Sequence, residues 1–268
     1  MRITFYKGAL IAFLFLAAPF ACRAALSDNL QLYFTYDVAN VSGASVTDLT
    51  GGGHTGTIVG TPTFAAGPGN VGRAIGLSGS ANYMTTTYNA ADTDFSACAW
   101  YKQTGSLVSF PRVLDRNYIN GFWVGESATS GSFGGGVKES TSPYGIYIAG
   151  THADSTWHFI CSVRSGTTHT IYRDTSSTSN TVSGAALSTT YSLIVGNDDS
   201  HTVNFNGYIT GVGYWNRALS SAEVSQLYNG GSGLAYPFTV TIAPRRKMLL
   251  FEGFRIKLVS DTIKLYQQ

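Results

Sequence analysis

A histidine and a cysteine lie three residues apart in the stretch TWHFICSVR, at residues 156–164. His158 and Cys161 are of the types that bind zinc, and a cysteine near a histidine is also the pairing of a thiol nucleophile with its base. The stretch reads as a β-strand, however, and positions three apart on a strand point to opposite faces. The two side chains are therefore expected to diverge, which disfavours both kinds of site.

Two acid-bearing segments are better suited to hold a metal ion. Residues 115–117 read DRN and residues 196–199 read GNDD. Carboxylate and amide oxygens are the ligands that calcium prefers. The candidate calcium ligands are Asp115, Asn117, Asp198 and Asp199. The alternative interpretation is that these are solvated turn residues.

Four aromatic residues are candidates for contact with a ligand. Sugar-binding sites combine an exposed aromatic face with a few polar groups that fix orientation. The candidates are Tyr118, Trp123, Tyr144 and Tyr147. They qualify only if they share one sheet surface, and packing in the core is the alternative for each of them.

The residue pattern predicts the elements that would position these side chains. Short β-branched and aromatic runs are separated by Gly-, Ser- and Asn-rich breaks, which is typical of a two-sheet sandwich or barrel. The predicted strands cover residues 30–36, 83–88, 95–102, 121–126, 144–150, 157–164, 169–174, 191–196 and 206–217. The Ser/Thr-rich residues 174–184 are expected to form an exposed loop.

One helix is predicted, within LSSAEVSQLYNGG at residues 219–231. Ser220 with Glu223 forms a capping-box pattern, and Gly230 and Gly231 follow as a stop signal. Two G-x-G-x-x-G matches, at residues 51–56 and 67–72, precede β-like segments rather than helices. They are therefore interpreted as turns and not as nucleotide-binding loops.

The N-terminus has the features of an export signal. Arg2 and Lys7 flank the start of an apolar run at residues 9–20, and cleavage is predicted after Ala24. A retained anchor and a lipid on Cys22 are the alternatives. No other stretch could span a bilayer. An exported chain would keep Cys98 and Cys161, a disulfide candidate whose alternative is a pair of free thiols.

The charge of the chain excludes one class of partner. The formal net charge is +2 over 268 residues, and 12% of the residues are charged. Nucleic-acid binding needs a strong basic field, so no nucleic-acid partner is expected.

The order of these segments resembles a LamG-like jelly-roll domain of the concanavalin A-like lectin/glucanase superfamily, a group that includes the pentraxins. The resemblance covers residues 26–238 and is most specific in FNGYITGVGYWNRALSSAEVSQLYNGG, at residues 205–231. It implies two stacked antiparallel sheets and extracellular binding. It also implies a disulfide between Cys98 and Cys161, buried positions for Trp100, Trp157 and Trp215, and calcium ligands in the loops after residues 115 and 196.

This sequence lacks the catalytic pattern of the glucanase branch of that superfamily. The glucanase branch uses paired carboxylates in an E-x-D-x-x-E strand, and none of the four glutamates of this chain has that arrangement. A G-x-S-x-G nucleophile elbow is also absent from the sequence. No catalytic residues are therefore assigned, and the chain is not expected to be an enzyme.

These observations divide the chain into three regions and favour one function. Residues 1–24 are the predicted signal peptide, 25–238 the all-β jelly roll with one short helix near its end, and 239–268 an extension with a candidate β-hairpin. The leading hypothesis is a secreted or cell-surface, non-catalytic module that binds a glycan or a surface protein, with calcium as a candidate cofactor. The alternatives are a structural, assembly or adhesion module of a cell surface or virion, and a divergent glycoside hydrolase.

Overall fold

The structure of the protein is a computed structural model. It describes residues 25–79, 81–104, 110–127, 132–137, 145–150, 154–238, 250–251, 254–259 and 262–267. The predicted signal peptide and Tyr144 lie outside these residues. Within the described chain, no helix is both long and apolar enough to cross a membrane.

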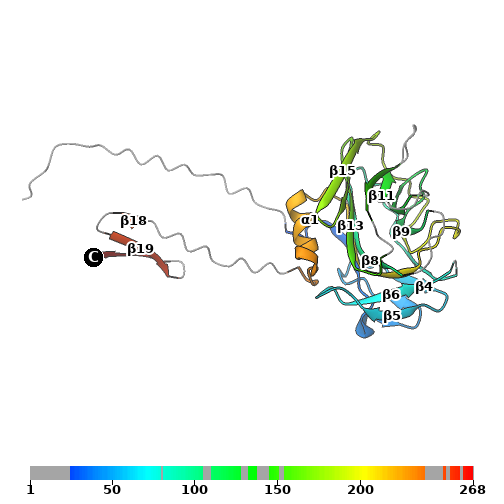
Figure 1. Ribbon diagram of the computed structural model, residues 1–268, viewed down its shortest axis with the longest axis horizontal. Helices are drawn as coiled ribbons and strands as arrows, with labels where there is room; N and C mark the ends of the chain where they lie inside the picture. The colour runs from blue at the N-terminus through cyan, green and yellow to red at the C-terminus, as the bar shows by residue number, and fades with distance from the viewer. Residues whose placement is uncertain are drawn as a thin grey trace, which may run out of the picture.

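Two antiparallel sheets stack face to face, as predicted (Figure 1). In order, the eight-stranded sheet contains β15 (Ser176–Thr181), β14 (Thr168–Arg173), β13 (His158–Ser165), β8 (Phe95–Gln103), β17 (Gly207–Trp215), β6 (Arg73–Leu77) and β5 (Thr63–Ala66), with β1 (Leu30–Phe34) also paired to β17. The nine-stranded sheet contains β12 (Ile146–Ala149), β11 (Ser132–Val137), β10 (Phe122–Glu126), β9 (Arg112–Asp115), β16 (Ile194–Val195), β7 (Tyr83–Thr86), β4 (Gly56–Val59), β3 (Ser45–Val46) and β2 (Val41–Ser42).

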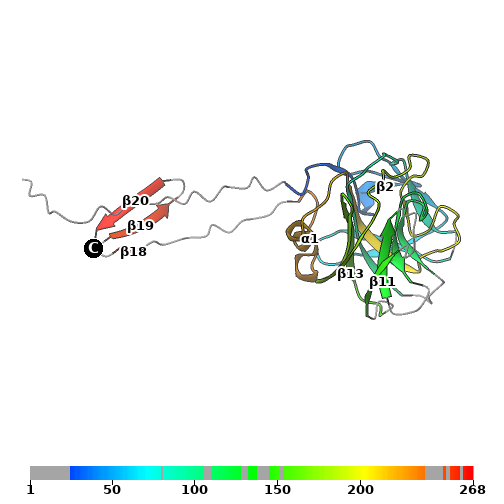
Figure 2. The ribbon, with the colours of Figure 1, turned by 90° about the horizontal axis from the view of Figure 1, so that it is seen from above.

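Strand β8 is buried on both faces because it lies between two apolar clusters. Its residues Phe95, Ala97, Ala99 and Tyr101 face the core between the sheets. The alternate residues Cys98 and Trp100 belong to a second cluster on the outer face of the eight-stranded sheet. Figure 2 shows helix α1 (Ser221–Tyr228), β13 and β11 in successive layers. The period of two along the strand thus separates the two clusters.

Local interactions set both ends of helix α1. The Ser220 side chain accepts a hydrogen bond from the backbone N–H of Glu223, and Glu223 accepts one from the backbone N–H of Ser220. This is the predicted capping box. The left-handed residue at the other end is Asn229, one position before the predicted glycine stop, and a 3-10 turn (Asn229–Gly231) follows. Asparagine tolerates this conformation better than most residues with a side chain.

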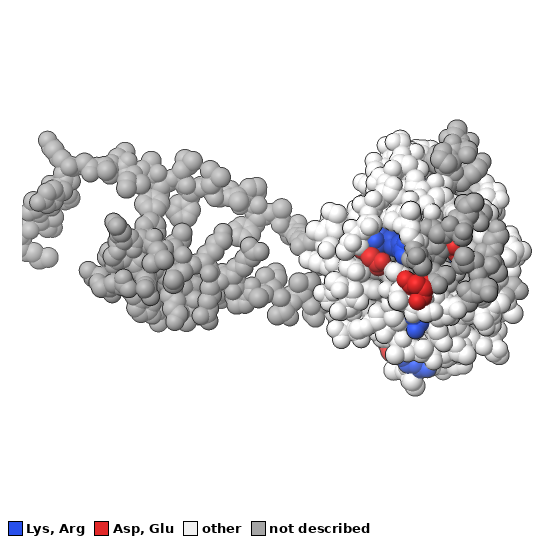
Figure 3. Space-filling model, in the orientation of Figure 1, with Lys and Arg blue, Asp and Glu red and all other residues white. Residues whose placement is uncertain are grey.

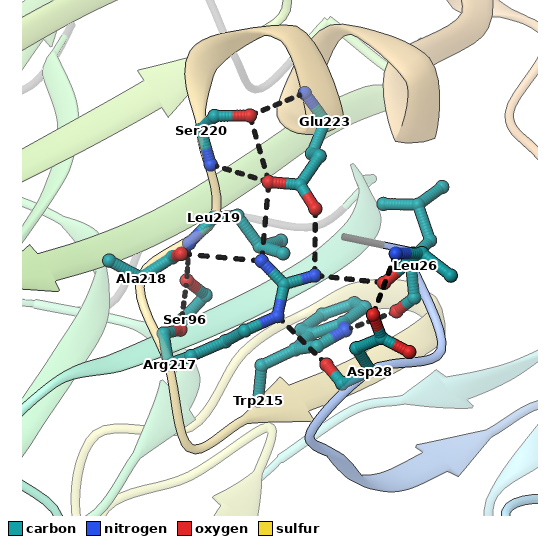
Figure 4. A network of polar contacts seen from close by, with 10 residues as sticks. Leu26, Asp28, Ser96, Trp215, Arg217, Ala218, Leu219, Ser220 and Glu223 are labelled. Atoms are coloured by element: carbon teal, nitrogen blue, oxygen red, sulfur yellow. Dashed lines mark hydrogen bonds and ion pairs between the residues drawn. The ribbon is translucent and has the colours of Figure 1, made fainter. Parts of the chain in front are cut away.

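The first described residues are held on the strand-to-helix junction (Figure 4). Arg217 donates to Glu223 at 2.7 Å and to the carbonyl oxygens of Ala25 and Asp28 at 3.0 and 2.8 Å. Trp215 Nε1 donates to the carbonyl oxygen of Leu26 at 2.6 Å. One arginine and one tryptophan therefore join the start of the domain to its last strand and helix.

The predicted disulfide is present between Cys98 and Cys161. These residues are direct partners in the register of β8 and β13. His158 and Cys161 are on opposite faces of β13, since Cys161 belongs to the outer cluster with Phe159 while Ile160 faces the core. Trp100 and Trp215 are buried, but Trp157 is only partly buried against the outer cluster.

All nine predicted strands are present, mostly shortened at their ends. The expectation of a loop at residues 174–184 is wrong, because β15 pairs with β14 over its whole length. The strand escaped notice because its Ser- and Thr-rich sequence buries almost nothing. Such a polar strand is suited to the edge of a sheet, which is where it lies.

The C-terminal extension contains a separate sheet. Strands β18 (Leu250–Phe251), β19 (Phe254–Val259) and β20 (Thr262–Gln267) pair antiparallel in that order. The pairing of β19 with β20 joins Val259 to Thr262 at the turn.

Candidate ligand-binding pocket

A pocket of about 590 Å³ opens on the outer face of the nine-stranded sheet. Strands β9, β10 and β12 form its floor, and the loop that follows β16 forms one wall. The lining residues are Phe110, Arg112, Tyr118, Trp123, Gly145, Tyr147, Asp198, Ser200, Thr202 and Val203. The volume is in the range of small-molecule sites in proteins.

Strand alternation explains why these side chains point away from the core. Phe122 and Val124 of β10 pack in the core, so Trp123 between them faces the other side. In the same way Ile146 and Ile148 of β12 pack against the core, and Tyr147 faces the pocket. The two-residue alternation of side chains along β10 and β12 therefore places Trp123 and Tyr147 on the same outer surface.

Three of the four aromatic candidates meet in this pocket. The rings of Trp123 and Tyr147 have centroids 5.8 Å apart at an angle of 46°. Tyr118 lines the same pocket and is 45% exposed, and Phe110 at the rim is 37% exposed. Trp123 is only 3% exposed, so it forms the base of the site. The outer aromatic faces available to a ligand belong to Tyr118, Tyr147 and Phe110.

Arg112 is the polar residue at the base of the pocket. Its guanidinium carbon lies 4.1 Å from the centroid of the Trp123 ring, and its Nε lies 3.4 Å from Oδ2 of Asp115. Burial lowers the pKa of Arg112 and raises the pKa of Asp115 to about 8. For both groups the loss of hydration outweighs the attraction of the partner.

The four candidate calcium ligands lie close together, beside the pocket. The Asn117 amide donates to Oδ2 of Asp199 at 2.8 Å, and Asp115 Oδ1 accepts from the backbone N–H of Asn117 at 2.6 Å. Asp198 accepts three hydrogen bonds, from the N–H and O–H of Thr202 and the N–H of Val203. The hydrogen bond between Asn117 and Asp199 thus joins the loop after β9 to the loop after β16.

This arrangement does not fit a calcium ion without a change. Most of the carboxylate oxygens already accept from protein donors, and the amide of Asn117 presents N–H rather than oxygen to Asp199. Among the residues that the structure describes, no three His, Cys, Asp or Glu side chains form a metal-binding group. Calcium binding by these four residues stays a prediction.

The sequence interpretation missed Arg112 and the loop residues Thr202 and Val203 as parts of the site. Arg112 is in a short apolar run, PRVLD, at residues 111–115, which was not predicted as a strand. A basic residue inside an apolar run is unusual enough to have marked it. The loop residues had no such signal, because serine, threonine and valine are common everywhere.

Residues 78–225 match the sequence profile of the concanavalin A-like lectin/glucanases superfamily. The match covers more than half of the chain. The chain belongs to this superfamily. Among curated proteins, none matches the sequence.

Several solved structures are similar to the fold. The binding domain of Paraclostridial Mosquitocidal Protein 1 has a TM-score of 0.60 at 15% identity, over 77% of this chain and 53% of that one. Domain 4 of AbnA, a GH43 extracellular arabinanase from Geobacillus stearothermophilus solved with arabinotriose, has a TM-score of 0.55 at 16% identity, over 74% and 97%.

The binding domain of Botulinum neurotoxin DC, solved with rat synaptotagmin II, has a TM-score of 0.57 at 13% identity. The match covers 91% of this chain and 63% of that one. This chain therefore spans less than two thirds of the length of the Botulinum neurotoxin and Mosquitocidal Protein 1 structures that it matches. At such identities these similarities establish the shared fold.

Proposed function

We propose that this chain is a secreted or cell-surface, non-catalytic module that binds a carbohydrate in the pocket on the nine-stranded sheet. The observation that carries the proposal is the pocket itself, which is lined by four aromatic side chains and one buried arginine. Aromatic faces stack on the apolar face of a sugar ring, and a few polar groups fix its orientation.

The chemistry of the pocket supports binding rather than hydrolysis. Glycosidases need two carboxyl groups, about 5 to 9.5 Å apart, on either side of the scissile bond. Asp198 is the one carboxylate among the described lining residues, and three loop donors already hold it. The pocket as described therefore has no free pair of carboxylates for the reaction.

The similar structures and the surface charge agree with a glycan ligand. The arabinanase domain was solved with arabinotriose, and another structure of the Botulinum neurotoxin DC binding domain was solved with SialylT. The face of the sandwich shown in Figure 3 is mostly uncharged, with a few acidic and basic atoms near its middle. The Cys98–Cys161 disulfide suits an oxidising, extracellular setting, which supports the proposed export.

The test is binding of the purified protein to a panel of neutral and acidic oligosaccharides, measured by calorimetry for each one that binds. Tyr118→Ala is expected to weaken binding about fivefold, because an exposed stacking face is lost at a cost of about 1 kcal/mol. Tyr208→Ala is the matched control, since this partly buried tyrosine lies on the other sheet next to the core residue Ile209.

The outcomes of this assay separate the proposals. Silence across the panel, or equal loss in both variants, contradicts a glycan site in this pocket. The same assay with EDTA and with added calcium tests the predicted calcium assistance independently of the pocket. The lining residues Phe110 and Tyr118, and Ile119 next to Tyr118 in the chain, are all more than one third exposed, which favours a protein partner if no glycan binds.

A further inference from the structure

We infer that the pocket selects a sugar acid, meaning a pyranose that carries a carboxylate, and that the carboxylate binds the guanidinium of Arg112. The inference rests on the proposed glycan-binding function and specifies its ligand class. It depends on the hydrogen bonds that Arg112 does not make within the protein.

Arg112 is only 7% exposed, yet its Nε and Nη1 atoms have no hydrogen-bond acceptor among the described residues. Buried guanidinium groups are ordinarily satisfied, because each unpaired N–H costs free energy. Arg112 lines the pocket, and both unpaired nitrogens are closed to solvent in this structure, so an acceptor that arrives from outside must displace the side chain or its neighbours slightly to reach them.

Two other buried arginines show how most donors of such a group are satisfied within this chain, although Nη1 of Arg116 has no hydrogen-bond partner and only an ion pair with Oδ2 of Asp92 at 3.7 Å. Arg116 donates to the carbonyl oxygens of Tyr191, Ala90 and Ser188, and it is fully buried. Arg164, also fully buried, is held by three backbone carbonyl oxygens in the same manner. Within the described part of the chain Arg112 has no comparable set of carbonyl partners, and of these three arginines only Arg112 lines the pocket.

The two nearby carboxylates, Asp115 and Asp198, do not accept hydrogen bonds from Nε or Nη1 of Arg112. Asp115 Oδ2 is 3.4 Å from Nε, beyond the usual hydrogen-bond range of about 2.7–3.2 Å, and neither atom has a hydrogen-bond partner among the described residues. Asp198 directs its oxygens to Thr202 and Val203. A planar guanidinium fork matches a carboxylate with two parallel hydrogen bonds, which a single sugar hydroxyl cannot supply.

The surrounding side chains fit the rest of such a ligand. Trp123 stacks on the guanidinium at 4.1 Å and fixes the plane of the fork. Tyr147 and the exposed Tyr118 offer apolar faces for the sugar ring, and the exposed Ser200 and Thr202 offer hydroxyl groups at the rim. The pocket therefore combines a carboxylate anchor with a ring-stacking surface.

The experiment compares pairs of sugars that differ only in the acid. Methyl β-glucuronide is titrated against methyl β-glucoside, and the methyl glycoside of N-acetylneuraminic acid against its neutral methyl ester. At least one acid is expected to bind ten times or more tightly than its neutral counterpart. Arg112→Gln is expected to abolish this preference, and Arg112→Lys to keep only part of it, because an ammonium group lacks the planar fork.

The outcomes separate this inference from the proposed function. Equal binding of acid and neutral sugars to the unaltered protein overturns the inference, whatever the stability of the Arg112 variants. If Tyr118→Ala still weakens binding of a neutral glycan, the proposed function survives that result. Tighter binding of glucose 6-sulfate than of both sugar acids also overturns the inference, in favour of a sulfated ligand. Failure of every sugar to bind contradicts both.

Discussion

At the scale of single residues, the interior contains a serine and a histidine that resemble part of a catalytic triad. Ser162 Oγ lies 2.9 Å from His169 Nε2, on neighbouring strands β13 and β14. Both side chains are fully buried, so no substrate can reach them as they stand. Burial lowers the pKa of His169 to about 4, which keeps the imidazole neutral at physiological pH. The pair is therefore interpreted as a structural hydrogen bond.

Because of His169, the free energy of unfolding is expected to fall in acid. Its pKa is lower in the folded chain than the ordinary value of 6.5, so the unfolded chain binds the proton more tightly. The stabilisation is complete above pH 6.5 and is lost as the pH falls towards 4, by an amount on the order of 3 kcal/mol. Urea unfolding at a series of pH values is the measurement.

The matched variant is His169→Gln, which cannot take up the proton. Its free energy of unfolding is expected to change less between pH 6.5 and 4 than that of the unaltered chain. An NMR titration of the His169 ring gives a second readout. A ring that titrates near 6.5 in the folded protein is incompatible with this account.

At the scale of elements, the strands differ in how far the sequence predicts them. Strand β8 is evident because aromatic and small residues alternate along it, and its two faces reach two apolar clusters. Strands β11 and β15 were missed, because SFGGGV and SSTSNT contain mostly glycine, serine and threonine. Their position in a sheet depends on the neighbouring strands rather than on their own propensity.

The candidate ligand-binding pocket shows the same difference between what residue pattern predicts and what only the fold reveals. The aromatic residues Trp123 and Tyr147 could be proposed from residue type, and strand alternation places them on one surface. The burial of Arg112, and the lack of acceptors for it among the described residues, arise from three strands and a loop that are distant in sequence. No local pattern reports such a combination, so only the folded structure shows it.

The disulfide between β8 and β13 carries a prediction at this scale. Cys98 and Cys161 close a loop with a sequence separation of 63 residues, and the chain-entropy argument assigns about 4 kcal/mol to such a crosslink. The variant with Cys98→Ser and Cys161→Ser is expected to lose about 2 to 4 kcal/mol of unfolding free energy. Urea unfolding with and without a reductant measures this loss.

The double variant is also its own control, since a reductant should no longer affect it. The unaltered protein should approach the stability of the variant when reduced. Equal urea midpoints for the oxidised protein and the double variant would show that the crosslink contributes nothing.

At the scale of the whole molecule, Arg217 joins the two ends of the jelly roll. Its guanidinium contacts Glu223 of α1 and the carbonyl oxygens of residues at the start of the domain (Figure 4). Glu223 is 4% exposed. Burial alone would raise the pKa of Glu223, but the hydrogen bonds from Arg217 and Ser220 outweigh it and lower the pKa. The carboxylate is thus stable only with its partners.

Arg217→Ala is expected to destabilise the protein by about 3 kcal/mol, because Glu223 would remain buried without its cation and two carbonyl oxygens would lose their donor. Arg217→Lys should lose less, since it keeps the charge but not the fork. Thermal unfolding of the two variants measures the order. A lysine variant that is no more stable than the alanine variant contradicts a contribution from charge.

The position of the crosslink has a consequence for how this molecule withstands its surroundings. Strands β9, β10, β11 and β12, which include the floor of the pocket, all lie between Cys98 and Cys161 in the chain. A protease that cuts once anywhere in this interval leaves two pieces that remain one covalent molecule. The segment that carries the floor of the pocket therefore has its two ends bonded to each other on the opposite sheet.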